Sequence, residues 1–258
     1  VRDVKFNNAG TKMLMLGWAN DGVYEYSLST AFDVSTITYV RTLDISSQDT
    51  AANSIEFNTD GTKLFMLGQG NDKVSEYALS TAFDLSSASF TDAFDISSQE
   101  IQPYGLAFNN DGTKMYVTGW IGDDINEYTL STGFNVSTAT FVDAYSVSSQ
   151  AGKPSAVQFD SDGNKMYVLD GGTDPTIHEY TLTTGFDVST ASYSSKSFTV
   201  TNQETKPRGF CFSNDGNKLF VCGWHGDDIN EYTVSTASVT LTTAPASGTQ
   251  VKILHKKG

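Results

Sequence analysis

Apolar and polar positions along the chain follow one pattern that recurs five times. A phenylalanine before an Asp-Gly-type turn marks each copy, and it stands at Phe6, Phe57, Phe108, Phe159 and Phe212, with offsets of 51, 51, 51 and 53 residues. A fixed period of this length is typical of repeat architectures, in which each unit buries its apolar faces against its neighbours. We therefore treat 1–258 as a single domain with repeats at about 1–54, 55–105, 106–156, 157–209 and 210–258.

The third repeat predicts four strands. Tyr104–Phe108 is a short strand, A, and the turn Asn109–Gly112 follows, in which glycine supplies the positive φ of a tight hairpin. Strand B, Lys114–Thr118, has counterparts that are apolar at nearly every position, which is typical of a strand covered on both faces. Strand C is expected at Ile125–Leu130, and strand D, Ala139–Val147, alternates like an outer strand.

Four antiparallel strands per unit, repeated radially around buried B strands, predict an all-β, five-bladed β-propeller. Turn signals every 8 to 12 residues and many β-branched and aromatic residues exclude a helical solenoid. The last copy diverges over 238–258. Either Val239–Thr243 forms the fourth strand of blade five, which we favour because an unfilled edge costs solubility, or two alternating runs form a hairpin leading into another domain.

The alternation of strand directions sorts the loops onto two faces. The D-to-A and B-to-C loops share one face, where tryptophans stand beside carboxylates and amides, a combination that suits sugars. The candidate ligand-binding residues are Trp18, Asn20, Asp21, Trp120, Asp123, Asp124, Trp224, Asp227, Asp228, Gln48, Gln99, Gln150 and Gln203. In the alternative reading, each indole packs on a neighbouring blade and the aspartates shape turns, because Gln69 and Gly171 replace the aromatic residue in two blades.

The opposite face carries residues that recur in every blade and favour a structural role. We expect the lysines beside the turns to contact aspartates of the C-to-D connections, and the phenylalanines of those connections to seal the underside. The glutamates of the C strands are expected to form hydrogen bonds between blades, because five identical copies argue against a catalytic ring. The lysines are Lys12, Lys63, Lys114, Lys165 and Lys218, and the glutamates are Glu25, Glu76, Glu127, Glu179 and Glu231.

Composition narrows the classes of partner. The chain has 30 acidic against 16 basic residues, a formal charge of −14, which repels nucleic-acid phosphates and anionic lipid. No apolar run approaches the roughly 18 residues that span a bilayer, so we expect no membrane insertion. A chain that begins at Val1 is expected to be a piece of a longer polypeptide, with further domains, or a processed one. Cys211 and Cys222 are expected to be buried free thiols.

Catalytic and metal-binding patterns are weak. The histidines, His178, His225 and His255, are scattered without ligand spacing, and no serine or cysteine stands in an elbow sequence. Asp160–Asn164 looks like the start of a calcium loop, but Gly171 stands where the twelfth position needs glutamate. We therefore expect no catalytic residue, metal or cofactor.

Two motifs carry a resemblance to known repeats. Pro-x-Gly at Pro103–Gly105 and Pro207–Gly209, with Asp-Gly-x-Lys-x-Tyr-Val at Asp111–Val117 and Asp162–Val168, resembles YVTN-type propeller repeats of bacterial and archaeal surface proteins. The longer connection Leu28–Thr36 is similar to propeller repeats of phage virion and tail-fibre proteins. These resemblances imply attachment at a surface, an extracellular or virion-associated location, and no known reaction.

The resulting expectation is a non-enzymatic, lectin-like binding module. Repeated loop sites on one face would bind glycans or a host or cell-surface receptor, and several sites on one ring would gain avidity. The first alternative is a structural spacer or protein-docking propeller. The second, a polysaccharide lyase or hydrolase, is least favoured because such enzymes build an asymmetric site, whereas these blades look nearly interchangeable.

Overall fold

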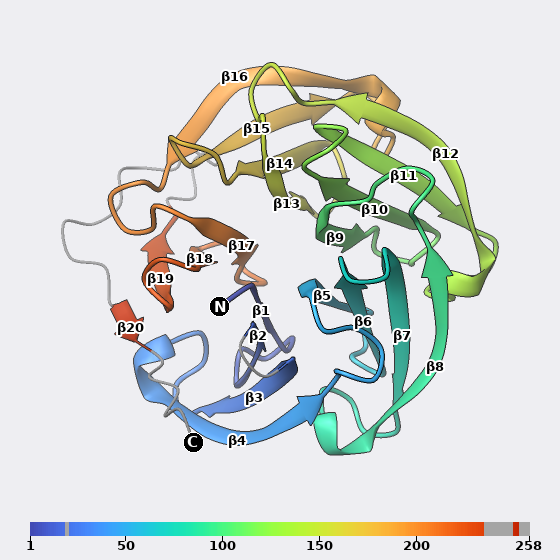
Figure 1. Cartoon of the computed structure of the whole chain (residues 1–258). Helices are drawn as coiled ribbons and strands as arrows, with labels where there is room; N and C mark the ends of the chain where they lie inside the picture. Colours follow the sequence, from blue (N-terminus) through green and yellow to red (C-terminus); the bar gives the residue numbers. More distant parts are fainter. Residues whose placement is uncertain (19–20, 235–249, 253–258) are drawn as a thin grey trace.

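Five four-stranded antiparallel sheets stand around a common axis in the computed structural model (Figure 1), which describes residues 1–18, 21–234 and 250–252. In each sheet the strands follow chain order from the centre of the ring outward. The predicted five-bladed β-propeller is confirmed. We call the face of the D-to-A and B-to-C loops the upper face and the opposite one the lower face.

Blades one to four each hold four strands and a one-turn 3₁₀ helix before the outer strand. Blades one and two comprise β1 (Asp3–Phe6), β2 (Lys12–Gly17), β3 (Gly22–Leu28), η1 (Val34–Thr36), β4 (Ile37–Asp44), β5 (Ala52–Phe57), β6 (Lys63–Gly68), β7 (Lys73–Leu79), η2 (Leu85–Ser87) and β8 (Ala88–Asp95). Blades three and four comprise β9 (Pro103–Phe108), β10 (Lys114–Gly119), β11 (Asp124–Leu130), η3 (Val136–Thr138), β12 (Ala139–Ser146), β13 (Pro154–Phe159), β14 (Lys165–Asp170), β15 (Thr176–Leu182), η4 (Val188–Thr190) and β16 (Ala191–Thr199).

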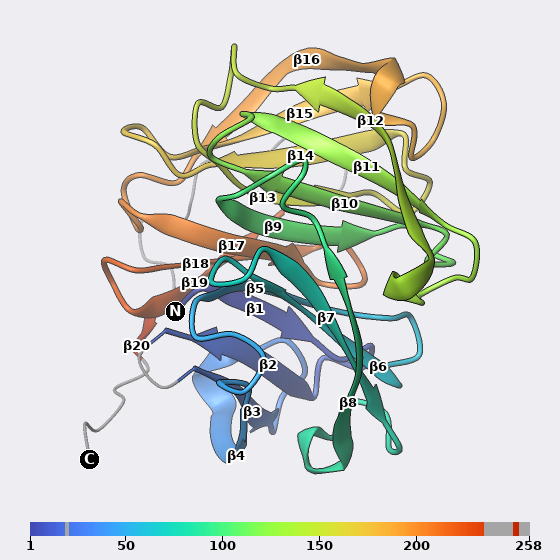
Figure 2. The same cartoon turned by 45° about the vertical axis from the view of Figure 1, so that its right-hand side comes forward.

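Blade five comprises β17 (Pro207–Phe212), β18 (Lys218–Gly223), β19 (Asp228–Thr233) and β20 (Gln250–Lys252). Its fourth strand, which pairs antiparallel with β19, is therefore β20 and not the expected segment Val239–Thr243, which lies outside the described residues. The ring closes where β1 packs beside β17 and β18, as both views show (Figures 1 and 2). The Lys218 Nζ adds a hydrogen bond of 2.7 Å to the Phe32 carbonyl across this junction.

The core lies between the blades rather than within them. In β2, Met13 and Met15 belong to the apolar cluster shared with blade five, whereas Leu14 and Leu16 belong to the cluster shared with blade two. Successive side chains of a strand point to opposite faces, so an unbroken apolar run covers both faces of the sheet. The prediction drawn from the B strands is confirmed, and it explains why no blade is stable without its neighbours.

The inner strands approach one another closely because only five surround the axis. A Cβ added at Gly105 would lie 2.8 Å from the Cα of Ala156 in the next blade. Glycine at this position therefore permits contact between two backbones. The cavities on the two faces of the ring share no lining residue in the described part of the chain.

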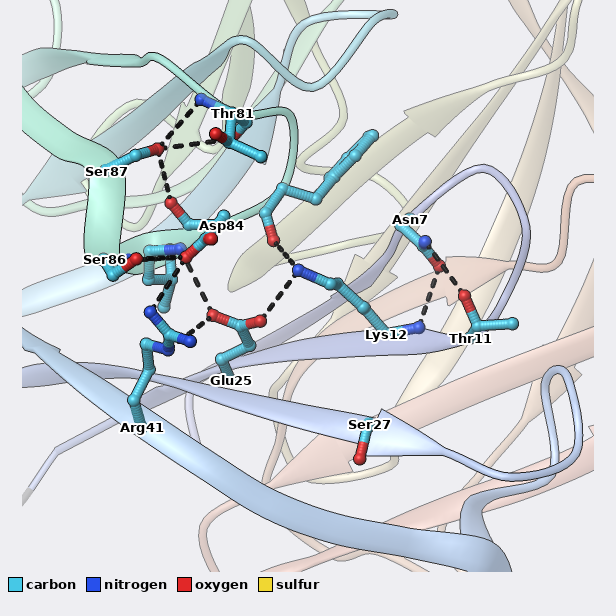
Figure 3. Close-up of polar contacts among 12 residues, drawn as sticks. Asn7, Thr11, Lys12, Glu25, Ser27, Arg41, Thr81, Asp84, Ser86 and Ser87 are labelled. Atoms are coloured by element: carbon cyan, nitrogen blue, oxygen red, sulfur yellow. Dashed lines mark hydrogen bonds and ion pairs between the residues drawn. The ribbon is translucent and has the colours of Figure 1, made fainter.

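Four of the turn lysines, Lys12, Lys63, Lys114 and Lys218, join two blades, but their partners differ from those expected. The Lys12 Nζ lies 2.9 Å from Glu25 Oε1 and donates a 2.8 Å hydrogen bond to the carbonyl of Phe83 in blade two (Figure 3). Glu25 Oε2 accepts a 3.2 Å bond from the Leu85 backbone N–H, so its predicted role between blades is confirmed. Two further glutamates repeat this inter-blade bond, Glu76 to Val136 and Glu127 to Val188.

The expected lysine–aspartate contacts are wrong because the aspartates serve the 3₁₀ helices. Asp84 Oδ1 accepts the Ser86 backbone N–H at 2.9 Å and caps η2, and Asp33, Asn135 and Asp187 cap the other three helices in the same way. An N-cap side chain satisfies backbone donors that the helix leaves free. The sequence shows both the lysine and the aspartate at this end of the blade, but not which acceptor is nearer.

The phenylalanines of the C-to-D connections seal the lower face as predicted. Phe83 has a positive φ of 53° and packs its ring on the turn glycine Gly61, whose own φ is 73°. A Cβ at Gly61 would collide with that ring. Gly61 is thus needed both for its left-handed backbone and for the close approach of Phe83.

The two cysteines of blade five are free and buried, as expected. Burial away from water disfavours the thiolate and raises the pKa of both the Cys211 and the Cys222 thiol. Both thiols are therefore held in the protonated state at neutral pH.

Candidate functional site

Chemical differences between the blades concentrate at the upper end of the inner strands. A register shift in the pairing of β5, β9, β13 and β17 with the next strand leaves one residue of each out of the ladder. This bulge residue is the middle one of the Pro-x-Gly sequence or its equivalent. The five residues at this position are Arg2, Asn53, Tyr104, Ser155 and Arg208. A bulge redirects a side chain out of the sheet, so the repeat provides four kinds of side chain at one level of the ring, with arginine in both blade one and blade five.

In blades one, two and three, the residue that follows strand B contacts the bulge residue of the same blade. In blade one the Arg2 guanidinium lies 3.9 Å from the centre of the Trp18 ring. In blade three the rings of Tyr104 and Trp120 stack at 4.1 Å with an 18° angle between their planes. Side chains at the two positions therefore form pairs on the upper face, and the indole of Trp120 also donates to Ser155 Oγ of blade four at 3.3 Å.

A cavity of about 630 Å³ opens on the upper face over blades three, four and five. Trp120 and Trp224 both line it, and Gly171 of blade four carries no side chain at the equivalent position. The absence of an aromatic ring there leaves room between the two indoles. The full lining is Trp120, Gly152, Lys153, Asp170, Gly171, Gly172, Thr173, Asp174, Lys206, Arg208 and Trp224.

Asp170 owes its place in this cavity to an exchange of residues between two loops. In blades two, three and five an acid of the D-to-A loop packs on a glycine that ends strand B: Asp49 on Gly68, Glu100 on Gly119 and Glu204 on Gly223. In blade four the loop residue is Ala151 and the strand ends in Asp170 instead. Asp170 Oδ1 accepts the backbone N–H groups of Lys153 at 3.1 Å and Gly172 at 3.0 Å, so the carboxylate still binds the loops but does so from the cavity wall.

Basic side chains gather on this wall although the chain is acidic overall. Lys153 Nζ lies 4.8 Å from the centre of the Trp120 ring, and the Arg208 guanidinium lies 4.7 Å from it and 5.1 Å from the Tyr104 ring. Lys206 also lines the cavity. Cations over aromatic faces are favoured where water is partly excluded. The cavity is therefore a locally cationic, aromatic-walled site with two carboxylates, Asp170 and Asp174, of which Asp170 is held in place by backbone donors.

Two of the cations are unusually buried. Arg2 and Arg208 each expose 8% of their surface. Burial, followed by the charge of Arg208, lowers the pKa of Arg2 to about 10, and burial also lowers the pKa of Arg208. Tyr104 interacts with both and opposes these shifts. Two guanidinium groups thus lie close enough to repel each other beside one phenol.

The predicted glutamines lie on the upper face but bind the neighbouring blade. Each accepts a hydrogen bond at its Oε1 from a tyrosine hydroxyl of the following C strand. The pairs are Gln48 with Tyr77 at 2.9 Å, Gln99 with Tyr128 at 3.4 Å, Gln150 with Tyr180 at 3.3 Å and Gln203 with Tyr232 at 3.4 Å. These contacts favour a role in joining blades.

The predicted aspartates mostly shape the B-to-C turns. Asp21, Asp123 and Asp227 have positive φ values of 44°, 48° and 49°. Asp124 and Asp228 accept the side-chain amides of the asparagines two residues on, at 2.7 and 3.0 Å. Burial raises the pKa of the Asp123 and Asp124 carboxyls. Asn20 lies outside the described residues, and ligand binding by the other residues of this set stays a prediction.

Of the residues predicted as ligand-binding, Trp120 and Trp224 line the cavity, while Trp18 lies over Arg2 with 47% of its surface exposed. Sequence reasoning missed Arg2, Tyr104 and Arg208 together with Lys206 and Asp170. The available signal was the variable middle residue of Pro-x-Gly, which differs between repeats that are otherwise alike. Equivalent positions filled by different residues indicate an asymmetric site.

Two negative findings complete the description. Within residues 1–18, 21–234 and 250–252, no three His, Cys, Asp or Glu side chains are grouped so that they could hold a metal ion. No helix in that part of the chain has the length and apolarity needed to cross a membrane.

Fold and site together define a β-propeller with an asymmetric, cationic cavity on its upper face. The chain belongs to the family described as "Lactonase, 7-bladed beta-propeller", whose model matches residues 24–252. The structure has five blades where the family description names seven. No curated protein is similar enough in sequence to count as a relative.

Solved structures of the same fold cover most of the chain. A candidate 6-phosphogluconolactonase from Bacteroides fragilis is 15% identical, with 96% of this chain and 69% of that chain covered and a TM-score of 0.55. A periplasmic gluconolactonase from Pseudomonas aeruginosa is 16% identical, with 96% and 72% covered and a TM-score of 0.50. A protein from Lactobacillus plantarum is 17% identical, with 95% and 72% covered and a TM-score of 0.57. At such identities the similarity shows the fold.

Family membership corrects the expected function. The expectation of a non-enzymatic, lectin-like adhesion module, with a spacer or docking platform as its alternative, is contradicted by the match to a family of lactonases. The family match supports a β-propeller, but kinship with phage tail-fibre or YVTN-type repeats is not shown. The error has a physical cause, because the expectation weighted residues that recur in every blade, whereas the cavity is built from residues that differ between blades.

Proposed function

We propose that the chain hydrolyses the ring ester of a sugar-acid lactone in the upper-face cavity. The single observation that carries this proposal is that the Asp170 carboxylate, held by two backbone N–H groups, shares one cavity with three cationic side chains and two indoles. Membership in a lactonase family, and structural neighbours described as a gluconolactonase and a candidate 6-phosphogluconolactonase, support the reaction class.

The cavity offers a distinct group for each part of the substrate. The indoles of Trp120 and Trp224 provide apolar surfaces on which the C–H face of a sugar ring packs. Lysine and arginine side chains donate to hydroxyl and carbonyl oxygens. A cavity of about 630 Å³ falls within the range of sites that enclose small molecules.

The reaction follows from these positions. Asp170 accepts a proton from a water molecule as the water oxygen forms a bond to the lactone carbonyl carbon. Lys206 or Arg208 stabilises the negative charge that develops on the carbonyl oxygen. The bond between the carbonyl carbon and the ring oxygen then breaks, the ring oxygen takes up the proton, and the open-chain acid leaves as a carboxylate. The backbone donors on Asp170 Oδ1 fix the orientation of the base.

The test is acid release from gluconolactone and from its 6-phosphate by purified protein, corrected for spontaneous hydrolysis. Asp170→Asn keeps the shape and one acceptor for the two backbone donors, and we expect a loss of about 100-fold or more in kcat with little change in thermal stability. Asp162→Asn, on the lower face, is the matched control and should retain full activity.

A second variant closes the cavity without touching the proposed base. A Cβ at Gly152 would meet no atom within 4 Å, so Gly152→Trp adds an indole to the lining without collision. We expect it to raise KM or abolish turnover while the protein stays folded. Wild-type protein that releases no acid above the spontaneous rate from either lactone, or full activity in both variants, would refute the proposal. The expected location outside the cell or on a virion, and the partners expected there, stay predictions.

A further inference from the structure

A pair of buried guanidinium groups lies beside the cavity, and three of their nitrogen atoms have no acceptor in the described part of the protein. Arg2 and Arg208 are more than nine-tenths buried. The Arg2 Nε, Arg208 Nε and Arg208 Nη1 atoms are buried without any hydrogen-bond partner. Buried donors without acceptors are rare in folded proteins, and leaving charged ones unpaired is costly.

The two arginines also repel each other. The charge of Arg208 contributes to the lowered pKa of Arg2, and the phenol of Tyr104 interacts with both side chains. The one carboxylate that acts on Arg208 is that of Glu204, and its two oxygens already accept the backbone N–H groups of Lys206, His225 and Gly226. Two like charges buried side by side favour an anion between them.

The aromatic surroundings hold the pair in place. Arg2 lies over Trp18, and Arg208 lies over Tyr104 and Trp120, so each guanidinium plane is fixed by a ring rather than by an acid. Arg2 Nε, Arg208 Nε and Arg208 Nη1 are left without an acceptor, and in-plane N–H groups of this kind are the donors that bind carboxylate and phosphate oxygens. Because Arg208 also lines the cavity, a ligand in the cavity can reach the pair.

We propose that Arg2, Arg208 and Tyr104 form an oxyanion-binding site at the inner edge of the upper-face cavity. The site takes a phosphate or carboxylate group, and it selects lactones that carry such a group over neutral ones. The anion-binding site is inferred from the geometry of the three residues alone. That the bound anion is part of a lactone rests on the proposed function.

The first experiment tests the anion site without activity. The purified full chain is heated at low ionic strength with increasing inorganic phosphate, acetate or chloride, and the midpoint of unfolding is followed. We expect saturable stabilisation by phosphate or acetate, because a ligand that binds the folded state raises its stability. Chloride at equal ionic strength is the control for screening.

Arginine variants identify the residues. Arg208→Met removes one charge of the pair, and we expect it to raise the midpoint in the absence of anions and to weaken the phosphate or acetate response about tenfold or more. Arg41→Met removes the remaining arginine of the sequence, which is ion-paired with Glu25 and Asp84, and we expect a lower midpoint with an unchanged anion response.

The second experiment assigns the anion to a substrate. The wild type and Arg2→Lys, which leaves the cavity lining unchanged, are compared on gluconolactone, its 6-phosphate and a lactone with a free carboxylate. We expect the variant to raise KM for one charged lactone at least tenfold and to leave neutral gluconolactone nearly unchanged. The charged lactone whose KM rises shows whether the site binds a phosphate group or a carboxylate.

Three outcomes overturn the anion site: no anion-specific stabilisation of the wild type, an equal response in Arg208→Met, or stabilisation by chloride alone. If anions stabilise the wild type but no lactone is hydrolysed, the site is upheld and the proposed function fails. If lactones are hydrolysed with equal loss for charged and neutral substrates in Arg2→Lys, the selectivity is refuted.

Discussion

The glutamates between the blades give a direct measure of what holds the ring together. Glu127 is 3% exposed, and its Oε1 lies 2.7 Å from Lys114 Nζ while its Oε2 accepts the Val188 backbone N–H of blade four at 3.0 Å. Glu127→Gln keeps the volume but turns one oxygen into an amide group that faces a donor in either orientation. One charged hydrogen bond is lost, which costs about 1.5–3 kcal/mol.

Glu179 occupies the same position in blade four and provides the matched comparison. Its Oε2 has no hydrogen-bond partner and lies 3.8 Å from Lys165 Nζ, while Lys196, which is half exposed, lies 3.3 Å from Oε1. Glu179→Gln can place its amide group at the Oε2 position without losing a bond. We expect a cost below about 1 kcal/mol, as for exposed ion pairs.

Urea unfolding of the wild type and the two variants measures the difference. We expect the free energy of unfolding to fall with urea concentration at the same slope in all three proteins. The urea concentration at the midpoint of unfolding should then fall clearly for Glu127→Gln and little for Glu179→Gln. In thermal unfolding, the larger loss corresponds to a fall of roughly 3–12 °C for a chain of this size. Equal losses, or a larger loss for Glu179→Gln, would show that the inter-blade hydrogen bond does not carry the stability assigned to it.

Two further outcomes follow from the structure. Asp170→Gly should lower the free energy of unfolding by about 2 kcal/mol, because two backbone donors lose their acceptor. Adding Ala151→Asp to this variant should restore most of the stability, because it recreates the acid-on-glycine contact of blade two. Additive losses in a double-mutant cycle would refute the exchange of residues between the two loops. Burial raises the tyrosine pKa values above their unfolded value of about 10, so stability is complete below pH 10 and declines above it as the unfolded state releases protons first. As the pH is raised, the absorbance of ionised tyrosine should therefore rise together with the loss of circular dichroism. Ionisation of these tyrosines in steps while the structure stays intact would contradict this coupling. The tyrosines concerned are Tyr26, Tyr77, Tyr116, Tyr128, Tyr167, Tyr180 and Tyr232.

Local patterns in the sequence were sufficient where the responsible contact lies within one repeat. The turn glycines, the apolar B strands and the four strands of the third repeat, to within one residue, could be predicted, because hairpin geometry and strand periodicity are local. The inter-blade glutamates could also be inferred, since recurrence in every blade indicates a shared structural contact. The lysine partners could not, because Lys12 Nζ reaches the Phe83 carbonyl, in addition to Glu25, only once two blades are packed together.

The site could not be predicted for a related reason. Asp170, Lys153 and Arg208 belong to different segments of the pattern and differ from their counterparts in other repeats, so each looks like tolerated variation when the repeats are aligned. The bulge turns Arg208 toward Tyr104 of blade three, and ring closure brings blade one, with Arg2, beside blade five. Neither contact has a signature in the spacing of residues.

The amino-acid sequence by itself determined the number of blades, the four-stranded unit and the faces on which its loops emerge, since these depend on periodicity and turn chemistry. Only the tertiary structure decided which of the non-repeating residues meet. Stacking five units around one axis places the ends of distant strands within a few ångströms of each other, and burial there changes what a charge can do. Two arginines separated by 206 positions in the chain become one cationic site only after the ring has closed.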